Sequence, residues 1–99
     1  MKVFDIKNMK AFSHAERNKN VLYGKENFKV RIIELPSQGE IQSCEMMSNV
    51  IFYVVKGTAE IMVNGEKTII SEGQCLITEP ATISMRTENY LRMIGIQIN

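Results

Sequence analysis

The chain has no tryptophan and, among its 99 residues, a single histidine, His14. Transition-metal centres commonly use imidazole ligands, and one histidine can supply few of them. No apolar run is long enough to span a bilayer. Residues 1–10 include Asp5 and Asn8 and lack the apolar stretch of a signal peptide. We therefore expect a cytoplasmic protein with no membrane partner.

Cysteine is also scarce, and neither sign of charge predominates. Cys44 and Cys75 lie far apart without a C-x-x-C spacing, so we expect two free thiols. The formal net charge is +1 and the basic residues are scattered. A basic stripe interleaved with aromatic residues is missing, which argues against a nucleic-acid partner. The apolar fraction of 44% and charged fraction of 23% are those of an ordinary globular domain.

Short strands separated by turn residues dominate the chain from residue 21 onward. Asn64-Gly65 lies between two alternating runs, which predicts a hairpin with a type I′ turn. Residues 1–20 predict only an irregular arm or an edge strand. The spacing is typical of a β-sandwich or barrel, with strands at 21–23, 28–35, 40–47, 50–55, 59–63, 66–70, 75–78, 83–85 and 91–98.

The strand predicted at residues 50–55 is apolar on both faces. One side carries Val50, Phe52 and Val54, and the other side carries Ile51, Tyr53 and Val55. A strand of this kind needs cover on both sides, and the outer side of a lone small barrel would meet water. We therefore expect a homodimer in which one sheet is covered by the partner.

The segment from Pro36 to Met85 resembles the cupin superfamily of small double-stranded β-helix barrels. The apolar run 51–55 followed by Lys56-Gly57 is similar to the end of the first cupin motif. Glu72-Gly73-Gln74 followed by Pro80 is similar to the second motif. The resemblance implies an all-β, jelly-roll-like barrel in residues 21–99 of a single domain, 1–99, and it also implies a homodimer.

The resemblance implies a metal site as well, and here the sequence departs from the family pattern. Cupins usually hold a divalent metal with His-x-His, a Glu and a later His. Counting back from Gly57 places Cys44 and Met46 at the His-x-His positions and Val50 at the Glu position. Counting on from Pro80 places Met85 at the position of the last His. None is an imidazole or a carboxylate, so we expect no metal and no other cofactor. The alternative is a Cu(I) site, because thiolate and thioether ligands suit that soft ion.

The favoured interpretation is a metal-independent barrel that binds a small apolar or mixed molecule in its mouth. The resemblance assigns the pocket lining to Cys44, Met46, Val50, Phe52 and Met85. One alternative is a small cupin enzyme of the isomerase, epimerase or lyase type, which would need a titratable group in the mouth. Another is a structural dimerisation module whose pocket is filled by its own side chains.

Three polar or reactive residues receive plainer interpretations. Cys75 lies in an apolar strand and is predicted to be a small buried hydrophobe. His14 lies in a polar segment and is predicted to be a lone surface histidine. A nucleophilic role for Cys44 would require a base or a cation beside it, and the sequence places neither there.

Overall fold

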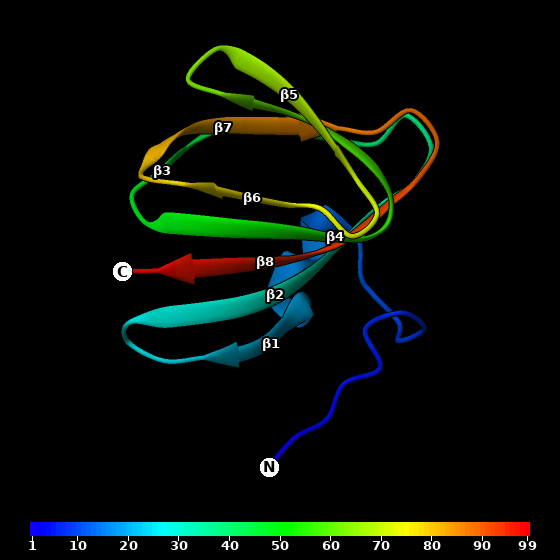
Figure 1. The fold of residues 1–99 in the computed structure, drawn as a ribbon. Helices are drawn as coiled ribbons and strands as arrows, with labels where there is room; N and C mark the ends of the chain where they lie inside the picture. The colour runs from blue at the N-terminus through cyan, green and yellow to red at the C-terminus, as the bar shows by residue number, and fades with distance from the viewer.

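The computed structural model describes residues 1–99, and strands form most of it (Figure 1). A short 3-10 helix, η1 (His14–Asn20), precedes all of the strands. The strands are β1 (Val21–Gly24), β2 (Phe28–Leu35), β3 (Glu40–Met46), β4 (Asn49–Val63), β5 (Glu66–Ser71), β6 (Cys75–Thr78), β7 (Ala81–Arg86) and β8 (Leu91–Ile98). The predicted all-β class is confirmed. The structure has no helix with the length and apolar character of a membrane span.

The strands form two antiparallel sheets that share β4. One sheet has the order β1-β2-β8-β4-β6, and the other has the order β3-β7-β4-β5. Figure 1 shows the second sheet curling over the first, so that the sheets enclose a common interior. The buried core in this interior contains Leu35, Val50, Phe52, Val54, Ala59, Ile61, Ile70, Ala81, Ile83, Met85, Leu91 and Met93.

A single bent strand connects the two sheets, where the sequence predicted two strands interrupted at Gly57. β4 is continuous over 15 residues. As far as Gly57 it pairs with β8, and beyond that residue it pairs with β5 and β7. Gly57 has a φ of +89°, and a Cβ there would lie 2.0 Å from the carbonyl oxygen of Tyr90. The glycine therefore redirects the strand into the second sheet instead of ending it.

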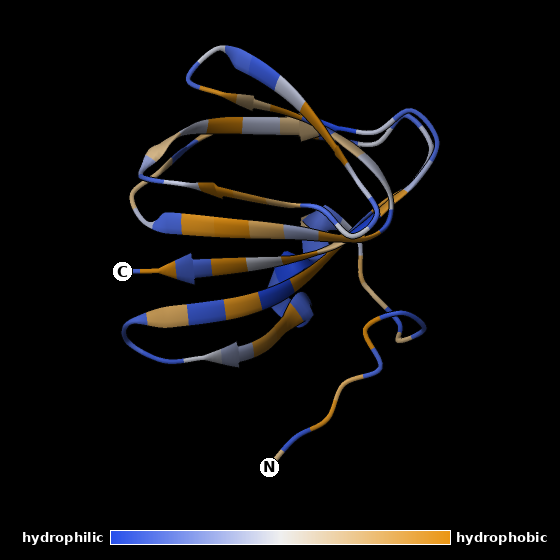
Figure 2. Cartoon of the chain, in the orientation of Figure 1, coloured by the Kyte–Doolittle hydropathy of each residue, from blue (hydrophilic) through white to orange (hydrophobic).

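The alternation of side chains along the strands follows the prediction at most positions. Val50, Phe52 and Val54 are buried, and Figure 2 shows hydrophobic and hydrophilic residues alternating along β2. Asn64 and Gly65 have φ values of +50° and +83°, which are the left-handed conformations that a type I′ hairpin requires.

The structure differs from the sequence-based expectation at the N-terminal segment and at Cys75. Residues 1–13 form no strand, and residues 14–20 form the 3-10 helix η1, which was not predicted. Cys75 was predicted to be buried, and this is wrong, because both free thiols are exposed. β6 is paired only with β4, and it places Cys75 opposite the half-exposed Tyr53 on the outer face of the sheet.

Candidate functional site

A cavity of about 570 Å³ lies between the two sheets, a volume typical of sites for small organic molecules. Strands β2, β4 and β8 contribute one wall, β3 and β7 contribute the other, and η1 lies at the rim. The five residues that the sequence assigned to a pocket are all found in its lining: Cys44, Met46, Val50, Phe52 and Met85. Residues from three different strands are thus brought to one site.

The floor of the cavity is apolar. Val50 and Phe52 are neighbours on the inner face of β4, and both are buried, as is Met85 on β7. Gly95 of β8 lies opposite Phe52 in the sheet and also lines the cavity. A Cβ at Gly95 would lie 3.4 Å from the Phe52 ring. A Cβ there would also lie 3.2 Å from the Cδ1 of Ile33, so Phe52 and Ile33 pack closely around the glycine.

The wall formed by β3 is open to solvent. Cys44 pairs with the buried Ile83 of β7, and Met46 pairs with Ala81, so both face the interior. Cys44 is nevertheless exposed, because β3 is the edge strand of its sheet and nothing continues the wall beyond it. Its thiol is directed to the carbonyl oxygen of Glu45 at 3.8 Å. The predicted pocket thiol is therefore accessible from the cavity mouth.

The rim carries three basic residues that sequence reasoning did not assign to the pocket, and two of them, Arg17 and Arg31, are cationic. Arg31 of β2 and His14 and Arg17 of η1 line the cavity. His14 was predicted to be a lone surface histidine; in the structure it is half-buried and lines the rim of the cavity. One signal was present in the sequence, since Arg31 occupies the same face of β2 as the inward-facing Ile33 and Leu35.

The two arginines have no carboxylate partner. Neither Arg17 nor Arg31 takes part in an ion pair, and the Nε of Arg31 is buried without a hydrogen-bond acceptor. Burial and then the charge of Arg17 lower the pKa of Arg31. Burial, followed by the charges of Arg17 and Arg31, also lowers the pKa of His14 below 6.5, so its ring is neutral at pH 7.

Two carboxylates also contribute to the lining of the cavity. Glu34 is already held by Arg92 at 2.7 Å and by the hydroxyl of Tyr90. Glu40, on the open β3 wall, is exposed and takes part in no ion pair. The positive charge of Arg31 is therefore not neutralised by either of them.

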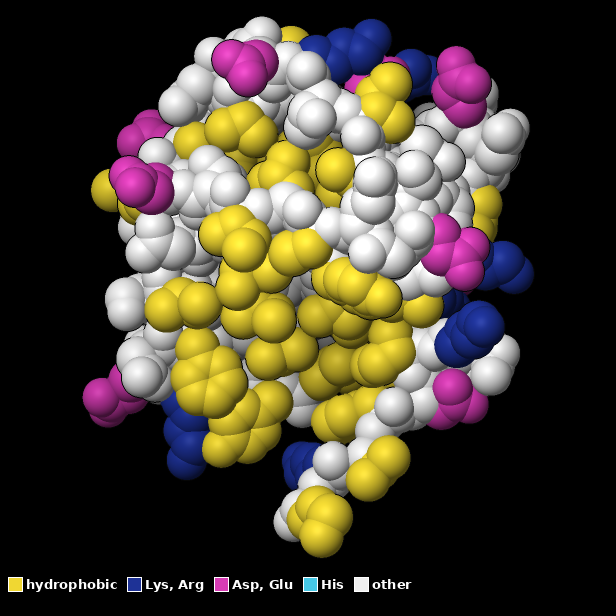
Figure 3. All heavy atoms as spheres, in the orientation of Figure 1, with side chains coloured by type: hydrophobic (Ala, Val, Ile, Leu, Met, Phe, Trp, Pro, Cys, Tyr) yellow, Lys and Arg dark blue, Asp and Glu magenta, His cyan; other side chains and the backbone are white.

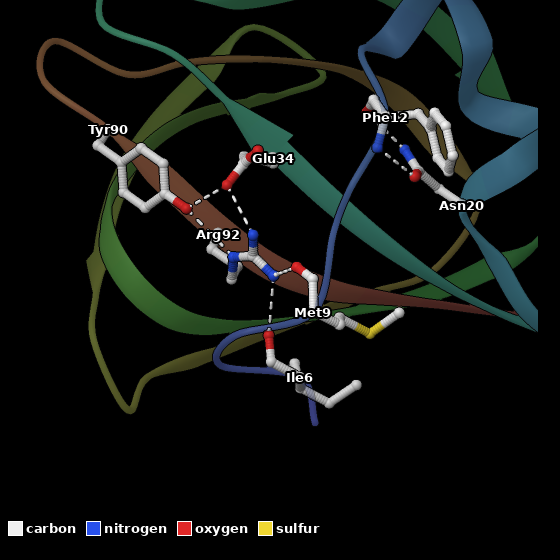
Figure 4. A network of polar contacts seen from close by, with 7 residues as sticks. All are labelled: Ile6, Met9, Phe12, Asn20, Glu34, Tyr90 and Arg92. Carbon is white, nitrogen blue, oxygen red and sulfur yellow. Dashed lines mark hydrogen bonds and ion pairs between the residues drawn. The ribbon is translucent and has the colours of Figure 1, made fainter. Parts of the chain in front are cut away.

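A buried polar network holds the segment before η1 against the barrel (Figure 4). Arg92 donates to the carbonyl oxygens of Ile6 and Met9 at 3.0 and 2.7 Å. The same guanidinium donates to Glu34 at 2.7 Å and to the Tyr90 hydroxyl at 3.1 Å. All three guanidinium nitrogens therefore have partners, in contrast to the Nε of Arg31.

Comparison with solved structures identifies the fold. A conserved protein of unknown function from Streptococcus pyogenes matches with a TM-score of 0.75 at 16% identity, over 80% of this chain and 70% of that one. The Cnp3 cupin domain of Schizosaccharomyces pombe matches with a TM-score of 0.73 at 18% identity, over 80% of this chain and 61% of that one. A cupin superfamily protein from Desulfitobacterium hafniense matches with a TM-score of 0.74 at 12% identity, over 91% of this chain and 83% of that one.

No protein-family model and no curated protein matches the sequence, so the likeness is one of structure. The chain has the cupin fold, as the sequence resemblance implied. The identities are too low to carry a ligand or a reaction from these proteins to this one.

The residues in the cavity do not fit the divalent metal that this fold usually holds. No group of three or more His, Cys, Asp or Glu side chains is placed to bind an ion. The cavity instead presents one thiol and two thioethers, from Cys44, Met46 and Met85. One thiol with two thioethers provides neither the imidazole and carboxylate ligands that suit Fe, Mn and Ni nor the three or four Cys, His or carboxylate ligands of a typical zinc site.

Proposed function

We propose that the protein is a metal-independent barrel that binds a small organic molecule between its sheets. The supporting observation is the cavity of about 570 Å³, whose apolar floor lies beside a polar rim. Pockets that combine a mainly apolar lining with a few polar groups are the usual sites for small ligands. A dimerisation module with a filled pocket is disfavoured by the same open volume.

The cavity can be tested with methyl NMR on protein carrying ¹³C-methyl methionine. Titration with benzyl alcohol, a small molecule of mixed polarity, is expected to shift the signals of Met46 and Met85, which line the cavity. Met47 is 78% exposed and outside the lining, so its signal is the internal control. Equal shifts at all three methionines, or none, would contradict the proposal.

Metal independence is tested separately by elemental analysis of the tag-free protein. We expect no stoichiometric Fe, Mn, Ni or Zn, and no retained copper after anaerobic incubation with Cu(I). One copper per chain, lost in both Cys44→Ala and Met85→Ala, would instead support the soft-metal alternative. A stoichiometric amount of any of the other four metals would contradict the assignment of the cavity residues.

A second candidate function is a small enzyme, and the position of His14 favours it. The ring lines the same cavity as Cys44, and its lowered pKa keeps it in the neutral form that accepts a proton. It would act as the general base of an isomerase, epimerase or lyase. Measurement of solvent deuterium exchange into a bound ligand, compared between the wild type and His14→Gln, tests this role.

We also propose that the protein is a homodimer that covers the outer face of the β1-β2-β8-β4-β6 sheet. Figure 3 shows hydrophobic side chains gathered over β4, β8 and β2. On this face Tyr53 is 44% and Ile77 is 71% exposed. A contiguous apolar area on a small protein is typical of an interaction surface, and a second copy supplies a matching apolar face by two-fold symmetry.

A further inference from the structure

We infer that the ligand of this barrel is a small organic acid, with its carboxylate bound at Arg31 on the rim and its apolar part on the floor of the cavity. The inference rests on the proposed small-molecule function and adds the chemical class of the ligand. It is carried by three observations: an unpaired guanidinium at the cavity, two further basic side chains beside it, and an apolar surface below.

The first observation is that Arg31 lacks a partner for its charge. The residue lies on the inner face of β2, opposite Gly95, and its Nε is buried with no acceptor. A buried donor without an acceptor costs roughly 1–3 kcal/mol, and more when it is charged. Arg92, on the outer face of the same sheet, shows the contrasting case, since Glu34, Tyr90 and two backbone carbonyls satisfy it. A bound anion would provide Arg31 with the acceptor that the chain does not.

The second observation is the charge surrounding Arg31. Arg17 and His14 line the same rim. Besides burial, the charge of Arg17 lowers the pKa of both His14 and Arg31. The only hydrogen bond of the Arg17 side chain is to the carbonyl oxygen of His14 at 3.2 Å. Two like charges near each other are unfavourable unless an anion lies between them. A guanidinium binds a carboxylate through two parallel N–H donors, which adds direction to the attraction.

The third observation is the composition of the floor. Val50, Phe52 and Met85 are buried and apolar, and Gly95, opposite Phe52, adds no polar side chain to this surface. A ring or a short alkyl chain would fit this surface, whereas a bare inorganic anion would leave it unfilled. The arrangement therefore favours an acid with an apolar body over phosphate or sulfate alone.

The inference is tested with benzoate and its neutral counterpart benzamide, which have nearly the same shape. Dissociation constants are measured by isothermal titration calorimetry at low and at moderate salt. We expect benzoate to bind at least about tenfold more tightly than benzamide, with the preference reduced by salt. In Arg31→Gln we expect benzoate binding to fall to the level of benzamide, while benzamide binding is unchanged.

Arg86→Gln is the matched control. Arg86 is already paired with Glu60 at 3.5 Å and does not line the cavity, so the preference for benzoate should persist. Arg17→Gln provides a second test if Arg31→Gln does not fold, because Arg17 is exposed and its loss is expected to reduce the preference severalfold. Equal binding of the two probes by the wild type, or an undiminished preference in both rim variants, overturns the inference alone. Failure of both probes to bind contradicts the proposed function itself.

The two free thiols allow a test that needs no ligand. Cys44 lines the cavity and Cys75 lies on the outer face, so the two can be compared within one molecule. The ratio of alkylation rates with iodoacetate and with neutral iodoacetamide reports the local potential at each thiol. We expect a severalfold higher ratio at Cys44 than at Cys75, falling to the Cys75 value in Arg31→Gln or Arg17→Gln. Equal ratios in the wild type would contradict a cationic rim.

Discussion

The side-chain amide of Asn20 forms two hydrogen bonds, both to the backbone of Phe12. Its Nδ2 donates to the carbonyl oxygen of Phe12, and the N–H of Phe12 donates to its Oδ1, each at 2.8 Å (Figure 4). Asn20 is only 3% exposed. This pair closes the segment that carries His14 and Arg17, so it fixes two of the three basic groups at the rim of the cavity.

Replacement of Asn20 by Ala is expected to destabilise the protein by about 2 kcal/mol, because it leaves a donor and an acceptor of the Phe12 backbone unsatisfied. The free energy of unfolding, from urea denaturation, measures this loss. Asn18→Ala changes an exposed residue of the same helix whose side chain forms no hydrogen bond, and it is expected to have little effect. An equal loss of stability in both variants would show that the pair with Phe12 does not hold the segment.

The Glu34 carboxylate predicts a specific dependence of stability on pH. Burial alone would raise its pKa, but hydrogen bonds from Tyr90 and Arg92 and the charge of Arg92 lower it below 4.5. A carboxylate with a lowered pKa stabilises the folded state above its unfolded-state pKa, and this contribution is lost as the pH falls through the folded pKa. We expect the unfolding free energy of the wild type to decrease below about pH 4.5 more steeply than that of Glu34→Gln.

The measurement is urea denaturation between about pH 3 and pH 7. Glu88→Gln removes an exposed carboxylate that takes part in no ion pair, and it should keep the slope of the wild type. If Glu34→Gln and the wild type have the same slope, the network around Arg92 does not couple to this carboxylate.

Gly57 allows a comparison between two effects of a glycine substitution. Gly57 and Gly73 have φ values of +89° and +84°, but only at Gly57 would a Cβ meet backbone atoms. We predict that Gly73→Ala costs about 1 kcal/mol, from backbone strain alone. Gly57→Ala should cost about 4 kcal/mol or more, because the Tyr90 carbonyl must move. Similar losses, measured by thermal or urea unfolding, would mean that the contact with Tyr90 does not shape the bend of β4.

Most of the barrel could be predicted from the sequence because each strand carries its own signals. The residues of β2, β6 and β8 were placed by β-branched or apolar runs bounded by turn residues, and the 64–65 turn by its Asn-Gly pair. The continuity of β4 was missed, since a glycine that bends a strand and a glycine that ends one look alike in sequence. Only the contact of Gly57 with Tyr90, across 33 residues of chain, distinguishes the two cases.

The site was predictable in part for a similar reason. The five lining residues lie at positions that the family resemblance identifies, and side-chain alternation carries them inward together. His14 was missed because its place at the rim depends on hydrogen bonds from distant residues, Asn20 to Phe12 and Arg92 to Met9. Cys75 was misplaced because an edge strand that is apolar on both faces does not reveal which face is covered.

The proposed dimer predicts that Ile77→Lys weakens self-association at least about tenfold, because it places a charge in an apolar interface. Sedimentation equilibrium measures the dissociation constant. Ile69→Lys is the control, since Ile69 is a comparably exposed isoleucine at 58%, on β5 of the other sheet. A wild type that is monomeric at high concentration, or equal effects of the two variants, would contradict an interface on the sheet that contains β6.

Calorimetric titration of benzoate into a pair of cysteine variants tests the central claim, a ligand site between the sheets, most directly. Cys44→Phe places a ring in the cavity mouth, and Cys75→Phe places the same ring on the outer face. Both positions are exposed, so both variants are expected to fold, which circular dichroism checks. We predict that Cys44→Phe abolishes benzoate binding and that Cys75→Phe binds like the wild type. Unchanged binding in Cys44→Phe would contradict the account, because the ligand would then lie outside the cavity.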